Sequence, residues 1–199
     1  MTEKLIRLPA LLIAIVCHEF AHGYVAYKLG DNTAKNRGRL TLNPLKHLDP
    51  IGFLLLFTLG FGWAKPVPIN PLYFKDRKLG TILVSIAGPL TNFALAILTA
   101  LLITLLKINN NLILSFVLPI FWYNIALGVF NLIPLPPLDG SKILASLLPN
   151  KYEYLFYKYE KYLYIILIVL IMTDTINVIL HPLIGVIFNF ILNLVSILT

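Results

Sequence analysis

Long apolar runs, separated by short polar stretches, occupy most of this 199-residue chain. A helix needs ~20 apolar residues to cross the ~30 Å hydrocarbon core of a bilayer. Three runs reach that length, and they are residues 5–29, 82–106 and 112–133. The C-terminal run, 161–199, is too long for one crossing, and its polar residues at 173–177 and 181–182 predict a break. The pattern therefore predicts an all-α polytopic membrane protein with about five membrane segments.

The stretch between the first two runs differs, because proline, glycine and short β-branched alternations interrupt it. Two such loops, residues 36–52 and 60–70, flank a short apolar piece at 53–59. That piece is too short to cross a membrane, and irregular backbone is tolerated at membrane depth only where protein or a water cavity covers it. We therefore expect a small β-hairpin or re-entrant region that folds back against the helices near one membrane surface.

Composition strengthens the membrane assignment. Hydrophobic residues make up 58% of the chain and charged residues 13%, whereas about a quarter of the residues in a soluble domain are charged. The chain lacks the charge to cover a soluble surface, and no linker divides residues 1–199, so we expect a single membrane-embedded domain. The one cysteine, Cys17, excludes an intrachain disulfide and a cysteine-based zinc cluster.

The net charge of +7 does not indicate a nucleic-acid partner, because the basic residues lie mainly in loops between apolar runs. Most of them lie between the first two runs or after the third, and only Lys107 lies between the second and the third. Lys4 and Arg7 oppose this bias but are outnumbered. The positive-inside rule then places both basic regions in the cytoplasm. Residues 151–164, which mix tyrosines with charges, are typical of an interfacial helix.

The first apolar run contains the motif HEFAH, which places ionisable groups where hydrocarbon is expected. His18 and His22 are four residues apart, so a helix projects both imidazoles from one face, where they can bind one metal ion. Glu19 lies beside them and can take a proton from water at the metal. The alternative is a polar patch packed between helices, but ionisable groups inside a span are costly and by default mark function.

A catalytic zinc ion usually has three protein ligands and one open position, so a third ligand is required. The candidates are Asp139, Asp49, His47, Asp174 and His181. Asp139 is favoured, because it follows the third span on the same membrane side as HEFAH and the prolines before it unwind the helix end. Its alternative role is to cap the short helix at 141–148. Asp174 and His181 are typical of caps or turns, and His47 belongs to a turn and is not taken as a ligand.

Three motifs together resemble one known family. HEFAH in the first span, GPLTN at residues 88–92 and NLIPLPPLDG at residues 131–140 are similar to the site-2 protease family of intramembrane zinc metalloproteases. The loops NPLKHLDPIG and GWAKPVPIN resemble its compact prokaryotic branch. The resemblance covers about residues 11–148, which leaves 151–199 as C-terminal helices. No insertion has the size of the PDZ domain that many members carry, so we expect a minimal core.

The resemblance implies one Zn²⁺ per chain, bound by His18, His22 and Asp139, with Glu19 as the catalytic acid and base. It also implies a catalytic role for Asn92, whose amide would stabilise the oxyanion or orient the substrate. An interhelical hydrogen bond is the alternative role of Asn92.

The implied activity is hydrolysis of peptide bonds in or next to transmembrane segments of membrane-protein substrates, near the cytoplasmic face, as in regulated intramembrane proteolysis. The protein would then be a multi-pass protein of the cell membrane, whose partners are its substrate and the lipid bilayer, with its oligomeric state left open. Two alternatives are a metal transporter that uses the same histidines as a transit site and a non-catalytic scaffold that binds membrane segments.

Overall fold

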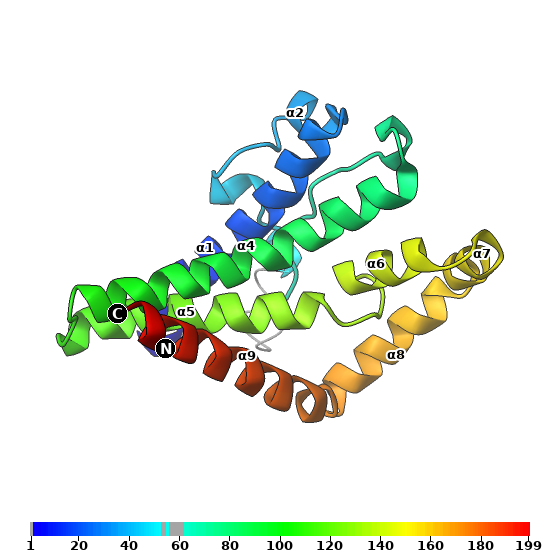
Figure 1. Cartoon of the computed structure of the whole chain (residues 1–199). Helices are drawn as coiled ribbons and strands as arrows, with labels where there is room; N and C mark the ends of the chain where they lie inside the picture. Colours follow the sequence, from blue (N-terminus) through cyan, green and yellow to red (C-terminus); the bar gives the residue numbers. More distant parts are fainter. Residues whose placement is uncertain (1, 53–54, 56–61) are drawn as a thin grey trace.

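The computed structural model describes residues 2–52, Leu55 and residues 62–199, with side chains from Arg7 onward. Helices dominate the described residues (Figure 1). The α-helices are α1 (Thr2–Lys28), α2 (Thr33–Asn36), α4 (Arg77–Leu105), α5 (Asn111–Asn131), α6 (Asp139–Leu147), α7 (Asn150–Lys158), α8 (Glu160–Met172) and α9 (Ile176–Leu198). Two 3₁₀ turns, η1 (Pro44–Lys46) and η2 (Pro71–Tyr73), lie between α2 and α4. The predicted all-helical class is confirmed.

Four helices are long and apolar enough to cross a membrane, namely α1 from Arg7 to Lys28, α4, α5 and α9. They correspond to the three predicted spans and to the second of the two C-terminal segments. The fifth predicted segment is α8, whose 13 residues are too few to cross the ~30 Å core. The described part of the chain therefore has four candidate spans rather than about five.

The predicted C-terminal break is confirmed at one position and wrong at the other. α8 ends at Met172 and α9 begins at Ile176, as the polar residues at 173–177 predict. Pro182, in contrast, lies inside α9. Each of the four candidate spans contains an internal proline. A membrane helix tolerates an internal proline because neighbouring helices, polar side chains and local helix adjustments can satisfy the backbone groups that the proline frees.

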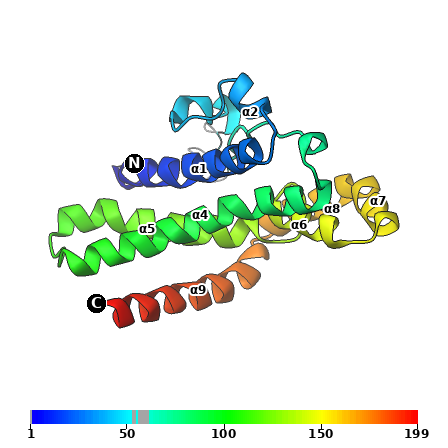
Figure 2. The same ribbon diagram turned by 45° about the horizontal axis from the view of Figure 1, so that its top comes forward.

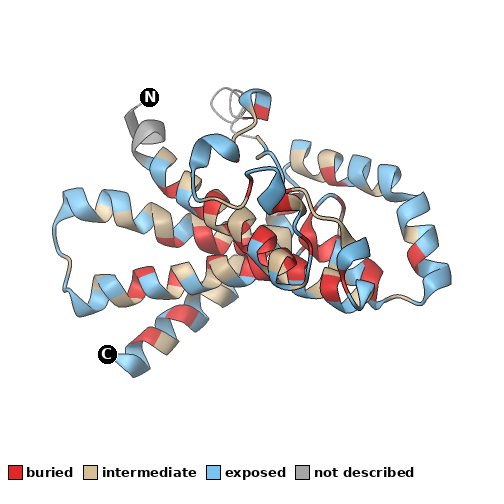
Figure 3. Ribbon diagram, turned by 90° about the horizontal axis from the view of Figure 1, so that it is seen from above, coloured by how far each residue is buried: buried red, intermediate tan, exposed pale blue. Residues whose placement is uncertain are grey.

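The helices α1, α4 and α5 pack against one another at the centre of the molecule, and α9 packs on α4 and α5 (Figures 1 and 2). The core between α4, α5 and α9 includes Ala96, Ile125 and Ile191, which are all at most 1% exposed. Both chain termini lie at the end where α4 turns into α5, and α7 lies at the opposite end. Buried residues gather where the central helices meet, whereas outward helix faces are largely exposed (Figure 3). Those outward faces are apolar, as expected of helices covered by lipid.

The described part of the region between α1 and α4 contains no strand, so the predicted β-hairpin is not observed. The two loops meet at an isolated antiparallel bridge between Leu48 and Ala64, beside which the Lys65 N–H donates to the His47 carbonyl (2.9 Å). Prolines near both sides of this bridge have no N–H, so they cannot extend a ladder of hydrogen bonds. The predicted apolar piece at 53–59 lies almost entirely outside the described residues.

The tyrosine-rich stretch, predicted as one interfacial helix, forms α7 and the first turn of α8, which meet at Tyr159. Glu153 of α7 points inward and is 5% exposed. At the start of α4, Arg77 donates from Nη1 and Nη2 to the two Glu153 carboxylate oxygens (2.7 and 3.0 Å), and Lys78 Nζ lies 3.2 Å from Glu153 Oε2. The hydrogen bonds from Arg77 outweigh burial and hold the pKa of Glu153 below its ordinary value. This ion-pair cluster ties α7 to α4.

We expect Glu153→Gln to lower the stability of the folded protein at neutral pH and to reduce its acid sensitivity. A carboxyl whose pKa is lowered by folding contributes its full stabilisation at pH values above its ordinary pKa. That contribution is lost as the pH falls from the ordinary pKa through the lowered pKa of the folded state. Because the Arg77 side chain is 46% exposed, solvent screening limits the contribution to about 1 kcal/mol. Thermal unfolding in detergent between about pH 7 and about pH 3 measures the effect.

The matched control for this variant is Glu160→Gln, because Glu160 is exposed at the start of α8. The wild type and Glu160→Gln should lose more stability on acidification than Glu153→Gln does. If Glu153→Gln keeps the full pH dependence of the wild type, the ion-pair cluster does not stabilise the fold.

Candidate active site

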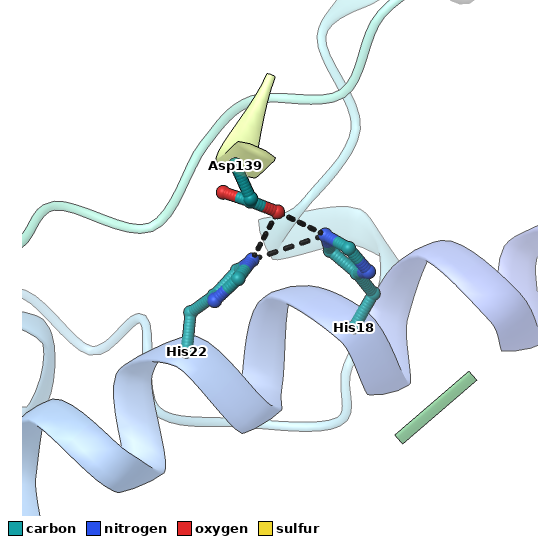
Figure 4. Close-up of side chains that lie close together, drawn as sticks. All are labelled: His18, His22 and Asp139. Carbon is teal, nitrogen blue, oxygen red and sulfur yellow. Dashed lines mark hydrogen bonds and ion pairs between the residues drawn. The ribbon is translucent and has the colours of Figure 1, made fainter. Parts of the chain in front are cut away.

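Three side chains from two distant parts of the chain meet beside α1 (Figure 4). His18 and His22 project from one face of α1, and Asp139 comes from the first turn of α6. The Asp139 Oδ2 atom lies 3.1 Å from His18 Nε2 and 3.0 Å from His22 Nε2, and the two Nε2 atoms are 3.0 Å apart. All three residues are at most 5% exposed. The structure thus brings together the three side chains that the sequence singles out as zinc ligands.

The donor atoms of this cluster fit a zinc ion. Zinc binds imidazole nitrogen and carboxylate oxygen at ~2.0–2.2 Å, so tetrahedrally arranged ligand atoms lie about 3.3 Å from one another. The observed separations of 3.0 to 3.1 Å are close to that value. Two imidazoles and one carboxylate are also a ligand set of catalytic zinc, which keeps the fourth position for water.

Asp139 reaches α1 because the chain turns sharply after α5. The helix ends at Asn131 and the proline-rich turn returns the chain toward α1, as the prolines predict. The turn is so tight that a Cβ on Gly140 would lie 2.2 Å from the Leu132 carbonyl oxygen, so glycine is required there. Asp139 does not cap α6 with its side chain, which argues against its alternative role as a cap.

The electrostatic surroundings keep Asp139 ionised. Burial raises the pKa of its carboxyl, but the close contacts with His18 and His22 and the charge of Lys142 lower the pKa more strongly. The pKa of Asp139 therefore lies well below its ordinary value. Lys142 Nζ donates to Oδ1 (3.2 Å), the carboxylate oxygen that does not face the histidines. Asp139 thus presents one charged oxygen to the centre of the cluster.

A backbone carbonyl sets the tautomer of His22. Among the residues that the structure describes, the hydrogen-bond partner of His22 Nδ1 is the Val84 carbonyl oxygen (2.7 Å), which can only accept. Nδ1 therefore carries the proton and donates it, so Nε2 of the neutral ring carries the lone pair. That lone pair faces Asp139 and His18, which is the arrangement that a metal-binding imidazole requires.

Two buried amides set the tautomer of His18 in the same way. Asn124 Nδ2 donates to the Ile120 carbonyl (2.8 Å), so Asn124 Oδ1 accepts from Asn92 Nδ2 (2.9 Å). Asn92 must then turn Oδ1 toward His18 Nδ1, which donates to it over 2.6 Å. The His18 Nε2 lone pair consequently faces the cluster. Asn124, fully buried in α5, has no motif around it that would single it out in the sequence.

A cavity of about 500 Å³ opens beside this cluster. Its lining is mainly apolar and comes from α1, α5, α8, the turn residues Pro137 and Leu138, and the loop residues Leu48, Gly52, Gly62, Trp63, Ala64 and Pro66. His18 and Glu19 line it from α1, and Asn131 lines it from the end of α5. Asn131 was not among the predicted site residues, although it opens the motif NLIPLPPLDG. Glu19 Oε2 accepts a hydrogen bond from the Val67 N–H (2.8 Å).

The other candidate ligands do not join the cluster. Among the residues that the structure describes, only His18, His22 and Asp139 bring three metal-binding atoms together. The His47 ring is fully buried and its Nε2 donates to the Thr41 carbonyl (2.7 Å). Asp49 accepts from the N–H groups of the two residues after Pro50, and Asp174 accepts from Asn177. These contacts fit the predicted turn and capping roles.

A buried His–His–Asp cluster with an adjacent glutamate, enclosed by candidate membrane helices, defines the site of a membrane-embedded metalloprotease. Comparison with known proteins agrees with this class. The model of peptidase family M50 matches residues 106–173. The chain is 42% identical to YwhC of Bacillus subtilis over 183 residues, which cover 88% of this chain and 84% of YwhC. The chain belongs to peptidase family M50, the site-2 protease family of zinc metalloproteases.

More distant relatives are longer proteins. Rip2 of Mycolicibacterium smegmatis is 31% identical over 182 residues, which cover 83% of this chain and 66% of Rip2. MJ0392 of Methanocaldococcus jannaschii is 33% identical over 148 residues, which cover 73% of this chain and 35% of MJ0392. MJ0392 is named a zinc metalloprotease, and YwhC and Rip2 are so named provisionally. No solved structure gives a significant match to the chain. The predicted family and enzyme class are confirmed.

Proposed function

We propose that this protein hydrolyses peptide bonds in or next to transmembrane segments of membrane-protein substrates. The observation that carries the proposal is the position of the cavity, which joins an apolar lining to the His18 and Glu19 side chains. An apolar cavity suits a membrane segment, whereas a soluble peptide would gain little there. Because a helix satisfies its own backbone hydrogen bonds, the substrate must unwind locally before its peptide bond becomes accessible.

His18 Nε2, His22 Nε2 and Asp139 Oδ2 would hold one zinc ion. When bound, zinc supplies Lewis acidity, which makes water a better nucleophile and polarises the scissile carbonyl. Glu19 accepts the proton of the attacking water and then donates it to the nitrogen of the leaving amine. Because Oε2 is engaged by the Val67 N–H, the other carboxylate oxygen of Glu19 is the one available for this transfer.

The contacts of Asn92 support a positioning role rather than the predicted oxyanion role. Asn92 Nδ2 donates to the Ala14 carbonyl (3.1 Å) and to Asn124, so both amide hydrogens are engaged. Asn92 would therefore hold the His18 ring and its tautomer. Asn131 lines the cavity and uses one amide hydrogen on the Leu127 carbonyl (3.0 Å). Its second amide hydrogen makes Asn131 the better candidate to contact a substrate carbonyl.

The charge distribution supports an active site toward the cytoplasmic side. The basic loop between α1 and α4 and the basic stretch through α7 follow helix ends opposite the chain termini. The positive-inside rule assigns such an end to the cytoplasm. Trp63 and Pro66, which belong to the loop between α1 and α4, also line the cavity.

The test of this function compares the wild type with Asp139→Ala. Purified wild type should contain one zinc ion per chain and cleave single-span fusion proteins reconstituted with it in liposomes. Asp139→Ala should lose most of the bound zinc and all cleavage, because two imidazoles alone leave the site one ligand short. Mass spectrometry of the products locates the cleaved bond relative to the membrane segment.

Two results would count against the proposal. If Asp139→Ala still binds one zinc ion per chain, the third ligand is a residue other than Asp139. A zinc-loaded wild type that cleaves none of a panel of fusion proteins, whose apolar segments carry glycine or proline at different depths, would contradict the protease activity. Lys142→Ala, which removes only the outer contact of Asp139, is the matched control and should keep most of its zinc.

A further inference from the structure

The proline-rich segment at 62–70 contacts Glu19, the proposed catalytic base. The motif HEFAH, which contains Glu19, does not predict this contact. Val67 is 6% exposed, and its N–H donates to Glu19 Oε2 (2.8 Å). Pro66 and Pro68 on either side have no N–H. In the sequence Pro-Val-Pro, the Val67 amide is therefore the one backbone donor, and it is directed at Glu19.

A buried arginine holds this segment from behind. Arg39 is 8% exposed, and its Nη2 donates to the carbonyls of Lys65 (2.7 Å) and Pro66 (3.3 Å). No carboxylate pairs with Arg39 among the described residues, and its buried Nε has no hydrogen-bond partner. Burying a cation without a counter-charge is costly. The two carbonyls just before the Val67 amide are the described polar partners that offset this cost.

The segment is fixed on both sides of Val67. On one side, the Lys65 N–H donates to the His47 carbonyl (2.9 Å). On the other side, the Asn70 N–H donates to Asp31 Oδ2 (2.6 Å), and Asp31 is fully buried at the end of α1. Because Asp31 and Glu19 both belong to α1 or the residues just after it, the segment is held in a defined register along α1. Arg39 acts closest to the peptide bond that carries the Val67 N–H.

We propose that Arg39 is a positioning residue for catalysis: it holds the Lys65 and Pro66 carbonyls so that the Val67 N–H orients the Glu19 carboxylate. The proposal rests on the proposed protease function, in which Glu19 transfers the proton. It assigns a role to the loop at 36–52, which none of the zinc-binding residues needs. With Oε2 anchored by the Val67 N–H, the Glu19 side chain is held in one rotamer at the edge of the cavity that it lines.

The test measures kcat, KM and zinc content for Arg39→Ala in the cleavage assay with a single-span fusion protein. A displacement of a catalytic group by ~1 Å can cost about 100-fold in rate, so kcat should fall roughly 10- to 100-fold. KM should change by less than about 3-fold, because Arg39 itself does not line the cavity. One zinc ion per chain should remain, because Arg39 contacts none of the three ligands.

The matched control is Arg37→Ala, which removes an exposed arginine two residues away and should match the wild type in all three quantities. An active wild type together with an unchanged kcat in Arg39→Ala overturns the proposal and leaves the protease function standing. A loss of kcat that Arg37→Ala reproduces, or that parallels loss of zinc, also overturns it. A wild type that binds zinc but cleaves nothing overturns both.

A second pair of variants decides the question if Arg39→Ala does not fold. Val67→Pro removes the N–H but keeps an apolar side chain, whereas Val67→Ala keeps the N–H and loses two methyl groups. The proposal expects a 10- to 100-fold lower kcat in Val67→Pro than in Val67→Ala, with zinc content equal in both. Equal kcat values for the two variants would show that the N–H does not orient Glu19.

Discussion

Glu19→Gln should abolish peptide hydrolysis while one zinc ion per chain remains bound. Glutamine has nearly the same shape, and its Oε1 can still accept the Val67 N–H. It has no charge, however, and cannot take a proton from water. General acid–base catalysis contributes about 10²- to 10⁴-fold in rate, and here one residue performs both transfers. The rate should therefore fall by at least about 10²- to 10⁴-fold, below what the cleavage assay detects.

The measurement is a purified, reconstituted assay in which zinc content and cleavage are determined on the same sample. Glu160→Gln at the exposed start of α8 is the control and should cleave like the wild type. Full activity of Glu19→Gln would eliminate Glu19 as the base. Loss of zinc in this variant would instead make Glu19 a metal ligand, which its contact with Val67 argues against.

Gly88→Ala should empty the metal site although it replaces none of the proposed ligands. A Cβ at Gly88 would lie 2.6 Å from His18 Cε1, from His22 Cε1 and from His22 Nε2. Such an approach is sterically forbidden, so α4 must move away from α1 or both imidazoles must rotate. Either movement separates the donor atoms, and even the loss of an outer partner of a ligand costs about 10- to 100-fold in metal affinity. We expect at least that loss of affinity, and loss of cleavage with it.

The control for Gly88→Ala is Gly185→Ala in α9, where a Cβ would meet nothing within 4 Å. Alanine is favoured over glycine inside a helix by about 1 kcal/mol, so Gly185→Ala should be neutral or stabilising. Zinc titration by competition with a chelator, together with thermal unfolding, separates the two variants. Wild-type zinc affinity in Gly88→Ala would mean that α1 and α4 are less tightly packed at this position.

Much of the metal site follows from local periodicity. The helical repeat alone puts His18 and His22 on one face of α1, because residues four apart are neighbours on a helix. The alternation of membrane sides from one span to the next places Asp139 at the same end of the helix bundle as His18 and His22. The roles of Asn92 and Asn131 did not follow in this way. Which amide faces a histidine and which faces the cavity depends on how α4 and α5 are rotated against α1.

The errors have the same origin. A count of apolar residues predicted about five membrane segments, but α8 breaks from α7 at Tyr159 and ends after 13 residues. The alternations at 36–52 and 60–70 predicted a β-hairpin or a re-entrant region, but the described residues there contain one isolated bridge, between Leu48 and Ala64, and no hairpin. In both cases the sequence pattern gave the polarity of the segment correctly. The conformation of the segment depended on how its backbone is hydrogen-bonded in the folded chain.

The sequence by itself determined the membrane class, the helical spans and the pairing of His18 with His22, because each depends on composition or on spacing within one segment. Motifs in three separate segments indicated the family and favoured Asp139 as the third ligand. The tertiary structure alone decided the tautomers of His18 and His22, the need for glycine at position 88 and the contact between Val67 and Glu19. These features join residues that lie far apart in the chain; His18 and Asn92, for example, are 74 positions apart. No helical or strand period reaches across such a distance, and only the packing of α1, α4 and α5 sets the separation of their atoms.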